Sequence, residues 1–262
     1  MTVYTIASGK GGVGKTVSTV NIGAALSALG QKTLVMDCDI GMANLNLMVI
    51  LDTRKQFSLH DVLAGKADIH DAITHTSYGM DVLPSGISIK GFRQADPEKL
   101  RGVMGQIVYE YEFILIDAPA GISKESVIPL AVSDEVVLIV NPELPSITDA
   151  LKTKLITDIV GRRVKGAIIN RVMGMKSELS ASRIAELLEV PIISVIPNDR
   201  SVMKSAALKV PVVVREPGSP AAKQFKAVAR KLANIGPLDV VEKEASRSGF
   251  ISRLLKSLGV KA

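Results

Sequence analysis

A glycine-rich stretch near the beginning of the chain has the composition of a phosphate-binding loop. It reads Gly9-Lys10-Gly11-Gly12-Val13-Gly14-Lys15-Thr16 and lies between a short apolar run and a helical pattern. This satisfies the motif G-x-x-x-x-G-K-[ST] in the strand, loop and helix setting that the motif requires. Small glycines allow successive backbone N–H groups to turn toward phosphate oxygens, and the N-terminus of the following helix adds a partial positive charge.

The last residues of this loop fit the chemistry of a nucleoside triphosphate bound with Mg²⁺. Lys15 is placed to reach the β- and γ-phosphates, and the hydroxyl of Thr16 can coordinate the metal ion. We therefore predict a site for ATP and Mg²⁺. The residues of this segment expected to contact the nucleotide are Gly11, Gly12, Val13, Gly14, Lys15, Thr16 and Val17.

Three carboxylates follow apolar runs that have the length of strands. Asp37 and Asp39 stand at the end of one such run, and Asp117 follows another, Phe113-Ile114-Leu115-Ile116, in the form of a Walker B motif. Asp117 is expected to hold a magnesium-bound water, while Asp37 and Asp39 could order the ion and a second water. Because Asp also favours turns, a loop-capping role for Asp37 or Asp39 is the alternative.

These motifs need a parallel sheet to position them, and the hydrophobic pattern predicts one. Short apolar runs alternate with segments of helical spacing, which indicates repeated β-α units. We expect an α/β fold with a doubly wound, mostly parallel sheet, helices on both faces and ligands at the carboxyl ends of the strands. The expected strands are 3–7, 33–36, 80–83, 113–116, 136–140, 166–169 and 192–196, and the expected helices are 17–29, 96–108, 147–160, 177–188 and 220–233.

The length and composition of the chain fit one large domain or two small ones. Hydrophobic residues make up 47% of the 262 residues, but only 3% are aromatic and none is Trp, so the core must consist of Val, Ile, Leu and Ala. The single cysteine, Cys38, can form neither an intrachain disulfide nor a metal cluster by itself, which fits a reducing cytoplasm. Neither a signal peptide nor a run of about 18 apolar residues is present, so we expect a cytoplasmic protein.

The end of the chain differs from the rest in charge and pattern. Residues 223–262 hold nine Lys/Arg and three Asp/Glu, a balance equal to the whole chain's +6. Gly236-Pro237 breaks the last helical pattern of the globule. We therefore expect an ATPase domain at 1–235, a flexible linker at 236–248 and a C-terminal amphipathic helix at 249–262.

This C-terminal helix has the pattern of an interfacial membrane anchor. At 100° per residue its apolar side chains fall within an arc of about 140°, and basic side chains lie on the opposite face. An anionic membrane surface is the expected partner, and packing on the globule or in a partner groove is the alternative. The predicted membrane residues are Phe250, Ile251, Arg253, Leu254, Leu255, Lys256 and Leu258.

The form K-G-G-x-G-K-T, with Lys10 as an additional lysine, resembles the deviant Walker A motif of the MinD/ParA group of ATPases. The chain looks most like archaeal-type MinD-like proteins, with matching motifs from Ser8 to about Val214 and again at the C-terminus. The resemblance implies a SIMIBI-like P-loop NTPase that forms a nucleotide-sandwich dimer. It also implies that Lys10 reaches the partner's phosphates, that Asp39 positions or activates the attacking water, and that Asp37 is an outer-sphere magnesium group.

The resemblance also implies where the base binds. Asn170-Arg171 is predicted to close the sixth strand and Pro197-Asn198-Asp199 the seventh, which would bring both segments beside the loop. The Asn170 amide would read adenine, with Arg171, Pro197 and Asp199 around the base, although such residues are also common in turns without ligands. Two departures from the family are Asn198, where an acidic residue is frequent, and Val17, where a second Thr could bond the α-phosphate at a gain of about 1 kcal/mol.

The functional expectation is an ATPase that acts as a switch. ATP and Mg²⁺ would bring two subunits together, the C-terminal helices would attach them to the inner face of the cell membrane, and hydrolysis would release them. The output would be spatial regulation such as division-site placement, through a protein regulator or effector whose identity the sequence does not give. Alternatives are a ParA-like partition ATPase that binds DNA and an ATPase that positions a polar or motility structure.

Two further classes fit less well. An iron–sulfur carrier on the same fold would need more cysteine ligands than Cys38 unless several subunits shared a cluster. A small-molecule kinase or synthetase would use the Walker motifs but would have no evident need for Lys10 or the C-terminal helix.

Overall fold

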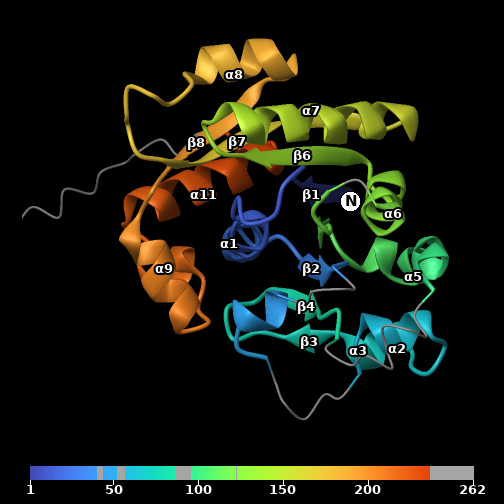
Figure 1. Cartoon of the computed structure of the whole chain (residues 1–262). Helices are drawn as coiled ribbons and strands as arrows, with labels where there is room; N and C mark the ends of the chain where they lie inside the picture. Colours follow the sequence, from blue (N-terminus) through green and yellow to red (C-terminus); the bar gives the residue numbers. More distant parts are fainter. Residues whose placement is uncertain (40–43, 52–56, 87–95, 122, 237–262) are drawn as a thin grey trace, which may run out of the picture.

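The computed structural model describes residues 1–39, 44–51, 57–86, 96–121 and 123–236. The predicted linker beyond Gly236 and the predicted membrane helix at 249–262, from Phe250 to Leu258, lie outside the described residues. Figure 1 shows a central sheet with helices on both of its faces, as the hydrophobic pattern predicts.

The sheet has eight strands in the described part of the chain, in the order β3-β4-β2-β5-β1-β6-β7-β8. All neighbours pair in parallel except the edge pair β3 and β4, which is antiparallel. The strands are β1 (Thr2–Ala7), β2 (Thr33–Asp37), β3 (Thr74–His75), β4 (Asp81–Leu83), β5 (Phe113–Asp117), β6 (Glu135–Val140), β7 (Arg163–Val172) and β8 (Ile192–Pro197).

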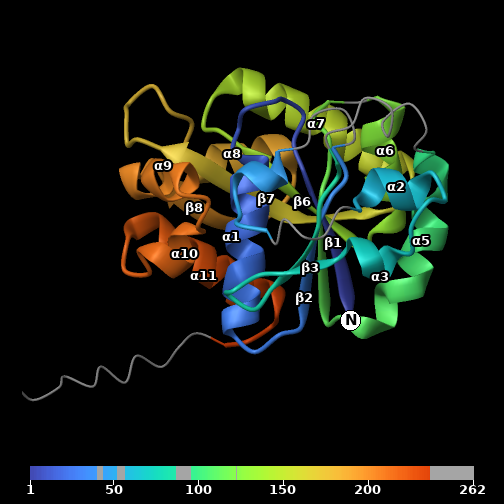
Figure 2. The same cartoon turned by 90° about the horizontal axis from the view of Figure 1, so that it is seen from below.

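The helices form two layers around the sheet (Figures 1 and 2). One layer consists of α1 (Lys15–Ala28), α9 (Arg200–Ala207), α10 (Val212–Arg215) and α11 (Pro220–Leu232). The other consists of α2 (Leu59–Leu63), α3 (Ile69–Ala72), α5 (Leu100–Ile107), α6 (Lys124–Val132), α7 (Leu144–Ile159) and α8 (Ala181–Leu188). Three 3-10 turns complete the described elements, namely Leu45–Leu47, Pro97–Lys99 and Val108–Glu110.

Burial on both faces explains why the strands read as continuous apolar runs. In β1, Tyr4 and Ile6 pack in the cluster that contains α1 and α11, whereas Val3 and Ala7 pack in clusters on the opposite face. Alternate side chains therefore enter different cores, and neither face can be polar. This arrangement makes the strands rigid supports for the loops at their carboxyl ends.

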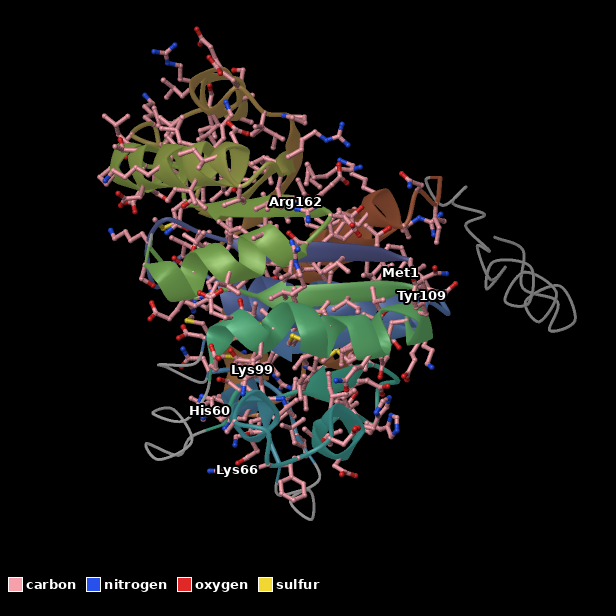
Figure 3. All side chains as sticks on the ribbon, turned by 90° about the vertical axis from the view of Figure 1, so that its right-hand side faces the viewer. Met1, His60, Lys66, Lys99, Tyr109 and Arg162 are labelled. Atoms are coloured by element: carbon pink, nitrogen blue, oxygen red, sulfur yellow. The ribbon has the colours of Figure 1, made fainter. Side chains whose placement is uncertain are left out.

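Turns at the other end of the sheet are also tied down. Arg162, labelled in Figure 3, donates two hydrogen bonds to the carbonyl of Ala131, at 3.1 Å from Nε and 2.9 Å from Nη2. These bonds join the end of α6 to the start of β7.

Every strand and helix predicted within the described residues is present, but the bounds of four elements differ by three or more residues from the prediction. The helix predicted from residue 96 begins at Leu100, after the 3-10 turn Pro97–Lys99, and the helix predicted from residue 147 begins at Leu144. The other two elements are β7 and α8. β7 continues to Val172, so Asn170 and Arg171 lie inside the strand rather than after it. Arg171 adopts a left-handed φ of 57°, and the pairing with β8 shifts register between Ile169 and Val172 before Val172 pairs with Pro197. The strand thus bends at the residues that face the phosphate loop.

The helix predicted from Ser177 begins at Ala181. Ser180 caps it by accepting a hydrogen bond from the Arg183 amide at 3.2 Å. The carboxylate of Glu178 accepts hydrogen bonds from the amides of Met173, Gly174 and Met175. Residues 177–180 are therefore held in a loop, and the capping serine was the signal that fixes the true start.

Candidate nucleotide-binding site

The phosphate loop joins the carboxyl end of β1 to the N-terminus of α1. Gly14 caps α1 with a φ of 94°, a left-handed conformation that favours glycine. A Cβ on Gly14 would lie 2.3 Å from Nδ2 of Asn170, and one on Gly9 would lie 2.1 Å from the Asp149 carbonyl oxygen. Glycine is required at both positions because neighbouring groups occupy the space that a side chain would need.

The two Walker motifs meet through the carboxylate of Asp117. Its Oδ1 accepts hydrogen bonds from Lys15 Nζ at 2.9 Å and from Thr19 Oγ1 at 3.2 Å, and its Oδ2 accepts one from Thr16 Oγ1 at 2.6 Å. Asp117 is 1% exposed, and the side chain of Lys15 is also buried. Lys15, Thr16 and Asp117 therefore form one cluster, in which Lys15 and Asp117 are buried and Thr16 is partly buried.

Thr19 is a member of this cluster that the motif analysis did not identify. Its hydroxyl oxygen also lies 3.0 Å from the Lys15 carbonyl oxygen, so its single hydrogen is shared between that carbonyl and Asp117. The available signal was its position four residues after Lys15, since residues at that spacing lie on the same face of a helix.

Asp37 lies beside Asp117 on the neighbouring strand. The two residues are paired in the register of β2 and β5, and Asp37 is 1% exposed. The pKa of Asp37 is raised to about 7, mainly because the carboxyl group is buried and, to a smaller extent, because of the negative charge of Asp117. Backbone hydrogen bonds from Asp39 and Leu45 act in the opposite direction and lower the pKa. Two buried carboxylates side by side are electrostatically costly and would be stabilised by a cation.

The donor atoms fit the magnesium ion that the fold family implies. Thr16, Asp37 and Asp117 supply oxygen, the ligand atom that Mg²⁺ prefers. Within the described ranges, no cluster of three or more His, Cys, Asp or Glu side chains could hold a metal ion. These side chains would therefore supply only part of a coordination shell, and phosphate oxygens and water would complete it.

Asp39 and Lys10 lie at the open side of the phosphate loop. Both line a hollow of about 320 Å³ together with Gly11, Gly12, Lys15 and Thr16. The side chain of Lys10 is exposed, in contrast to that of Lys15. Lys10 is thus placed at the surface of the site and not within the buried Lys15–Asp117 cluster.

A second hollow of about 500 Å³ adjoins the first and contains the predicted base-binding residues. Gly14, Val17 and Arg171 line both hollows. The predicted residues Asn170, Arg171, Pro197 and Asp199 all line the second one. Its other lining residues are Met173, Asn198, Val202, Met203, Ala206 and Phe225.

Two polar side chains that line this hollow, Asn170 and Asp199, already make hydrogen bonds within the protein. Asn170 Nδ2 donates to the carbonyl of Val13 in the phosphate loop at 2.8 Å. Asp199 caps α9 and accepts hydrogen bonds from the amides of Ser201 at 2.8 Å and Ala221 at 3.1 Å. Partial burial would raise the pKa of Asp199, but these bonds outweigh it and lower the pKa. Asp199 therefore supports the wall of the hollow through its caps.

The apolar wall of the hollow was not identified from the sequence. Met173, Met203 and Phe225 come from three separate segments, and none belongs to a recognisable motif. Phe225 follows the apolar spacing of α11, which predicts only a core position. Their common location depends on tertiary packing.

Among the described residues, no helix combines the length and apolar character needed to cross a membrane.

Comparison with known proteins identifies relatives over most of the chain. Residues 4–212 match the model of the CobQ/CobB/MinD/ParA nucleotide binding domain. An ATP-binding protein of Methanocaldococcus jannaschii is 46% identical over 253 residues, which cover 97% of this chain and 95% of the relative.

Two solved structures show how closely the fold agrees. The septum site-determining protein MinD of Pyrococcus horikoshii, solved as a complex with Mg-ADP, has a TM-score of 0.85 and 34% identity, covering 88% of this chain and 95% of its own. MinD in the MinC:MinD cell division complex of Aquifex aeolicus has a TM-score of 0.81 and 32% identity, covering 90% of this chain and 97% of its own. With its phosphate loop, its paired carboxylates and these relatives, the chain belongs to the MinD/ParA family of nucleotide-binding proteins and is of the archaeal MinD-like type.

Proposed function

We propose that this protein is an ATPase whose ATP-dependent dimerisation drives reversible attachment to a membrane, in the service of spatial regulation such as division-site placement. The observation that carries the proposal is the cluster of Lys15, Thr16 and Asp117 beneath the phosphate loop. It supplies the cation, the hydroxyl and the carboxylate that phosphoryl transfer from ATP requires, in one place.

Different residues of the cluster are proposed to bind the phosphates and the metal ion. The backbone of the loop and Lys15 would hold the phosphates. Thr16 and Asp117 would hold Mg²⁺, with Asp37 next to Asp117 on the neighbouring strand. Magnesium, when bound, neutralises charge on the phosphate oxygens. Asp39, on the open side of the loop, orients the water that attacks the γ-phosphate.

The adjoining hollow would receive the base. The bond from Asn170 to Val13 uses one amide hydrogen, so the second hydrogen and the oxygen remain for contacts with adenine. Arg171 lines both hollows and can reach the sugar or the phosphates from its bent strand. Pro197 and the capped Asp199 form part of the wall.

Dimerisation is proposed to depend on Lys10. An exposed lysine at the rim of the phosphate site can contact the phosphates of a second subunit without disturbing the fold of its own. ATP would then act as part of the dimer interface. The MinC:MinD complex of the A. aeolicus relative supports the further proposal that the dimer recruits a protein partner.

Membrane attachment is proposed from the sequence of residues 249–262. One short helix with five partly buried apolar side chains gains only several kcal/mol from a membrane, which is marginal. Two tethered helices in one dimer raise the effective concentration and make binding stable. Dimerisation would thus control attachment from the cytoplasm to the inner face of the membrane.

Cosedimentation with liposomes tests this proposal. Full-length protein with Mg-ATP should sediment with vesicles that contain anionic lipid, and sediment weakly with Mg-ADP. A chain truncated after Ser248 should stay in the supernatant and keep its ATPase activity. Undiminished sedimentation of the truncated chain would overturn the anchor.

A DNA-binding partition ATPase is the second candidate, favoured by one structural observation. Residues 200–231, which contain α9, α10 and α11, carry eight Lys/Arg and a single acidic residue, Glu216. Such a basic surface can bind nucleic acid without sequence preference. Salt-sensitive retention of DNA by the truncated chain, with ATP, would favour this candidate over membrane attachment.

A further inference from the structure

We propose that Ser85 and His60 are positioning residues for Asp39, which set the rate of hydrolysis without contributing to nucleotide affinity. The inference rests on the proposed function, because it takes Asp39 as the residue that orients the attacking water. It concerns a hydrogen-bonded chain that runs from the loop after β2, through the loop after β4, to α2.

The backbone of Asp39 is held at both of its polar atoms. Its N–H donates to Oδ1 of Asp37 at 2.9 Å, and its carbonyl accepts a hydrogen bond from Oγ of Ser85 at 3.1 Å. Asp37 belongs to β2, and Ser85 follows β4, the parallel neighbour of β2. Asp39 is therefore fixed between the ends of two adjacent strands.

Ser85 is in turn supported by His60. Its Oγ lies 3.4 Å from Nε2 of His60, and both side chains are buried, at 0% and 2% exposure. Because the single hydroxyl hydrogen is directed to the Asp39 carbonyl, the serine oxygen is left to accept from the Nε2–H tautomer of His60. The order of donation is thus His60 to Ser85 to Asp39, and the histidine link is the longer of the two.

The helix that carries His60 is fastened to the same loop. The amides of Leu59 and His60 donate to the carbonyls of Pro84 and Ser85 at 2.8 and 3.0 Å. At the start of α2, Ser58 and Asp61 form a capping box. Figure 3 labels His60 beside this short helix, on the same side of the molecule as α5. The imidazole is therefore presented to Ser85 by a helix whose first two amides bond to the loop that carries Ser85.

The positions of Ser85 and His60 should affect the rate of ATP hydrolysis and not the binding of ATP. In the described residues, neither Ser85 nor His60 lines the two hollows around the phosphate loop, so neither is placed to contact the nucleotide. A misplacement of about 1 Å in a positioned group can lower a rate by roughly 100-fold. Loss of the bond to the Asp39 carbonyl should therefore lower kcat and leave the KM for ATP unchanged.

Paired substitutions at both positions test the chain of bonds. Ser85→Ala should lower kcat by roughly 10- to 100-fold, and Ser85→Thr, which restores a hydroxyl, should recover most of it. His60→Leu should lower kcat by a smaller factor, and His60→Gln, whose amide can donate from a similar position, should recover it. The KM for ATP and the affinity for Mg-ADP should change by less than about two-fold in all four, because the phosphate loop is intact.

A control on the same helix separates positioning from stability. Ser58→Ala removes the capping box and should lower the stability of the protein without changing kcat. A fall in kcat for Ser58→Ala equal to that for Ser85→Ala, or Leu and Gln variants of His60 with the same kcat, would overturn the inference.

Asp39→Ala distinguishes the inference from the proposed function. If Asp39→Ala keeps wild-type hydrolysis, the proposed role of Asp39 is wrong. If Asp39→Ala abolishes hydrolysis but Ser85→Ala has the wild-type kcat, the role of Asp39 stands and the positioning chain is wrong.

Discussion

The carboxylates of Asp37 and Asp117 lie side by side on the parallel strands β2 and β5, at paired positions of the register. Both are almost completely buried, and Lys15 and Thr16 donate to only one of them, Asp117. Asp37 instead accepts hydrogen bonds from the backbone amides of Asp39, Asn44 and Leu45. The loop after β2 is thus bonded directly to the pair of carboxylates.

This pair predicts a pH-dependent stability in protein freed of nucleotide and metal. The pKa of Asp37 rises from its ordinary 3.8 to about 7, so over that interval the folded chain binds more protons than the unfolded chain. The contribution of Asp37 to the free energy of unfolding should therefore fall as the pH rises from 3.8 to about 7, and be level above. Urea unfolding in the presence of EDTA, repeated at several pH values in this interval, measures the free energy of unfolding.

Asp37→Asn provides the comparison. The amide will disturb the three backbone hydrogen bonds, but that cost does not depend on pH. The variant should therefore gain stability relative to wild type as the pH rises toward 7. A constant difference between the two proteins would show that Asp37 ionises normally.

Substitution of Lys15 should affect both binding and folding. In Lys15→Gln the loop loses its phosphate-binding cation, and Asp117 loses a buried ionic partner. Removing one member of a buried pair typically costs about 3–5 kcal/mol. We expect Mg-ATP affinity to fall by at least roughly 100-fold, equivalent to about 2.7 kcal/mol, together with a lower melting temperature. Isothermal titration and thermal unfolding measure the two effects, and Lys10→Gln, which alters an exposed lysine, is the matched control for stability.

Val17 allows a prediction in the direction of tighter binding. It lines both hollows at the first turn of α1, where a threonine hydroxyl could bond the α-phosphate. A hydrogen bond is typically worth about 1 kcal/mol net and somewhat more to a charged acceptor, so Val17→Thr should bind Mg-ADP at least roughly five-fold more tightly. Val17→Ala, which removes side-chain volume without adding a donor, should show no such gain. Equal affinities for Val17→Thr and wild type would mean that the hydroxyl does not reach the nucleotide.

The sequence predicted the fold, and it predicted that Lys15, Thr16 and Asp117 lie together, because both predictions depend on local patterns. Continuous apolar runs identify strands that are buried on two faces, and the loop motif identifies Lys15, Thr16 and Asp117 by spacing and context. The edge strand β3 and the short helices α2, α3, α6, α9 and α10 were not predicted, because two to nine residues carry too little periodicity. Their positions depend on tertiary contacts.

The lining of the second hollow was predicted only in part for the same reason. Asn170 and Asp199 were correctly expected near the loop, but their bonds to Val13 and to the start of α11 connect residues far apart in the chain. The chain from His60 through Ser85 to Asp39 is another such case, since it joins one helix and two loops that no motif relates. Long-range hydrogen bonds of this kind follow from the sheet order and not from local sequence.

Lys10 is the residue on which the dimer proposal depends most directly. Its side chain is exposed at the rim of the phosphate site, so Lys10→Ala should leave the melting temperature unchanged and reduce Mg-ADP affinity little. In an Asp39→Ala background, which should slow hydrolysis, wild-type Lys10 is expected to give a dimer with Mg-ATP, whereas Lys10→Ala should remain monomeric. Size-exclusion chromatography with light scattering measures the mass. Lys223→Ala, an exposed lysine on α11, should dimerise normally; a Lys10→Ala protein that dimerises equally well would show that the lysine does not contact the partner's phosphates.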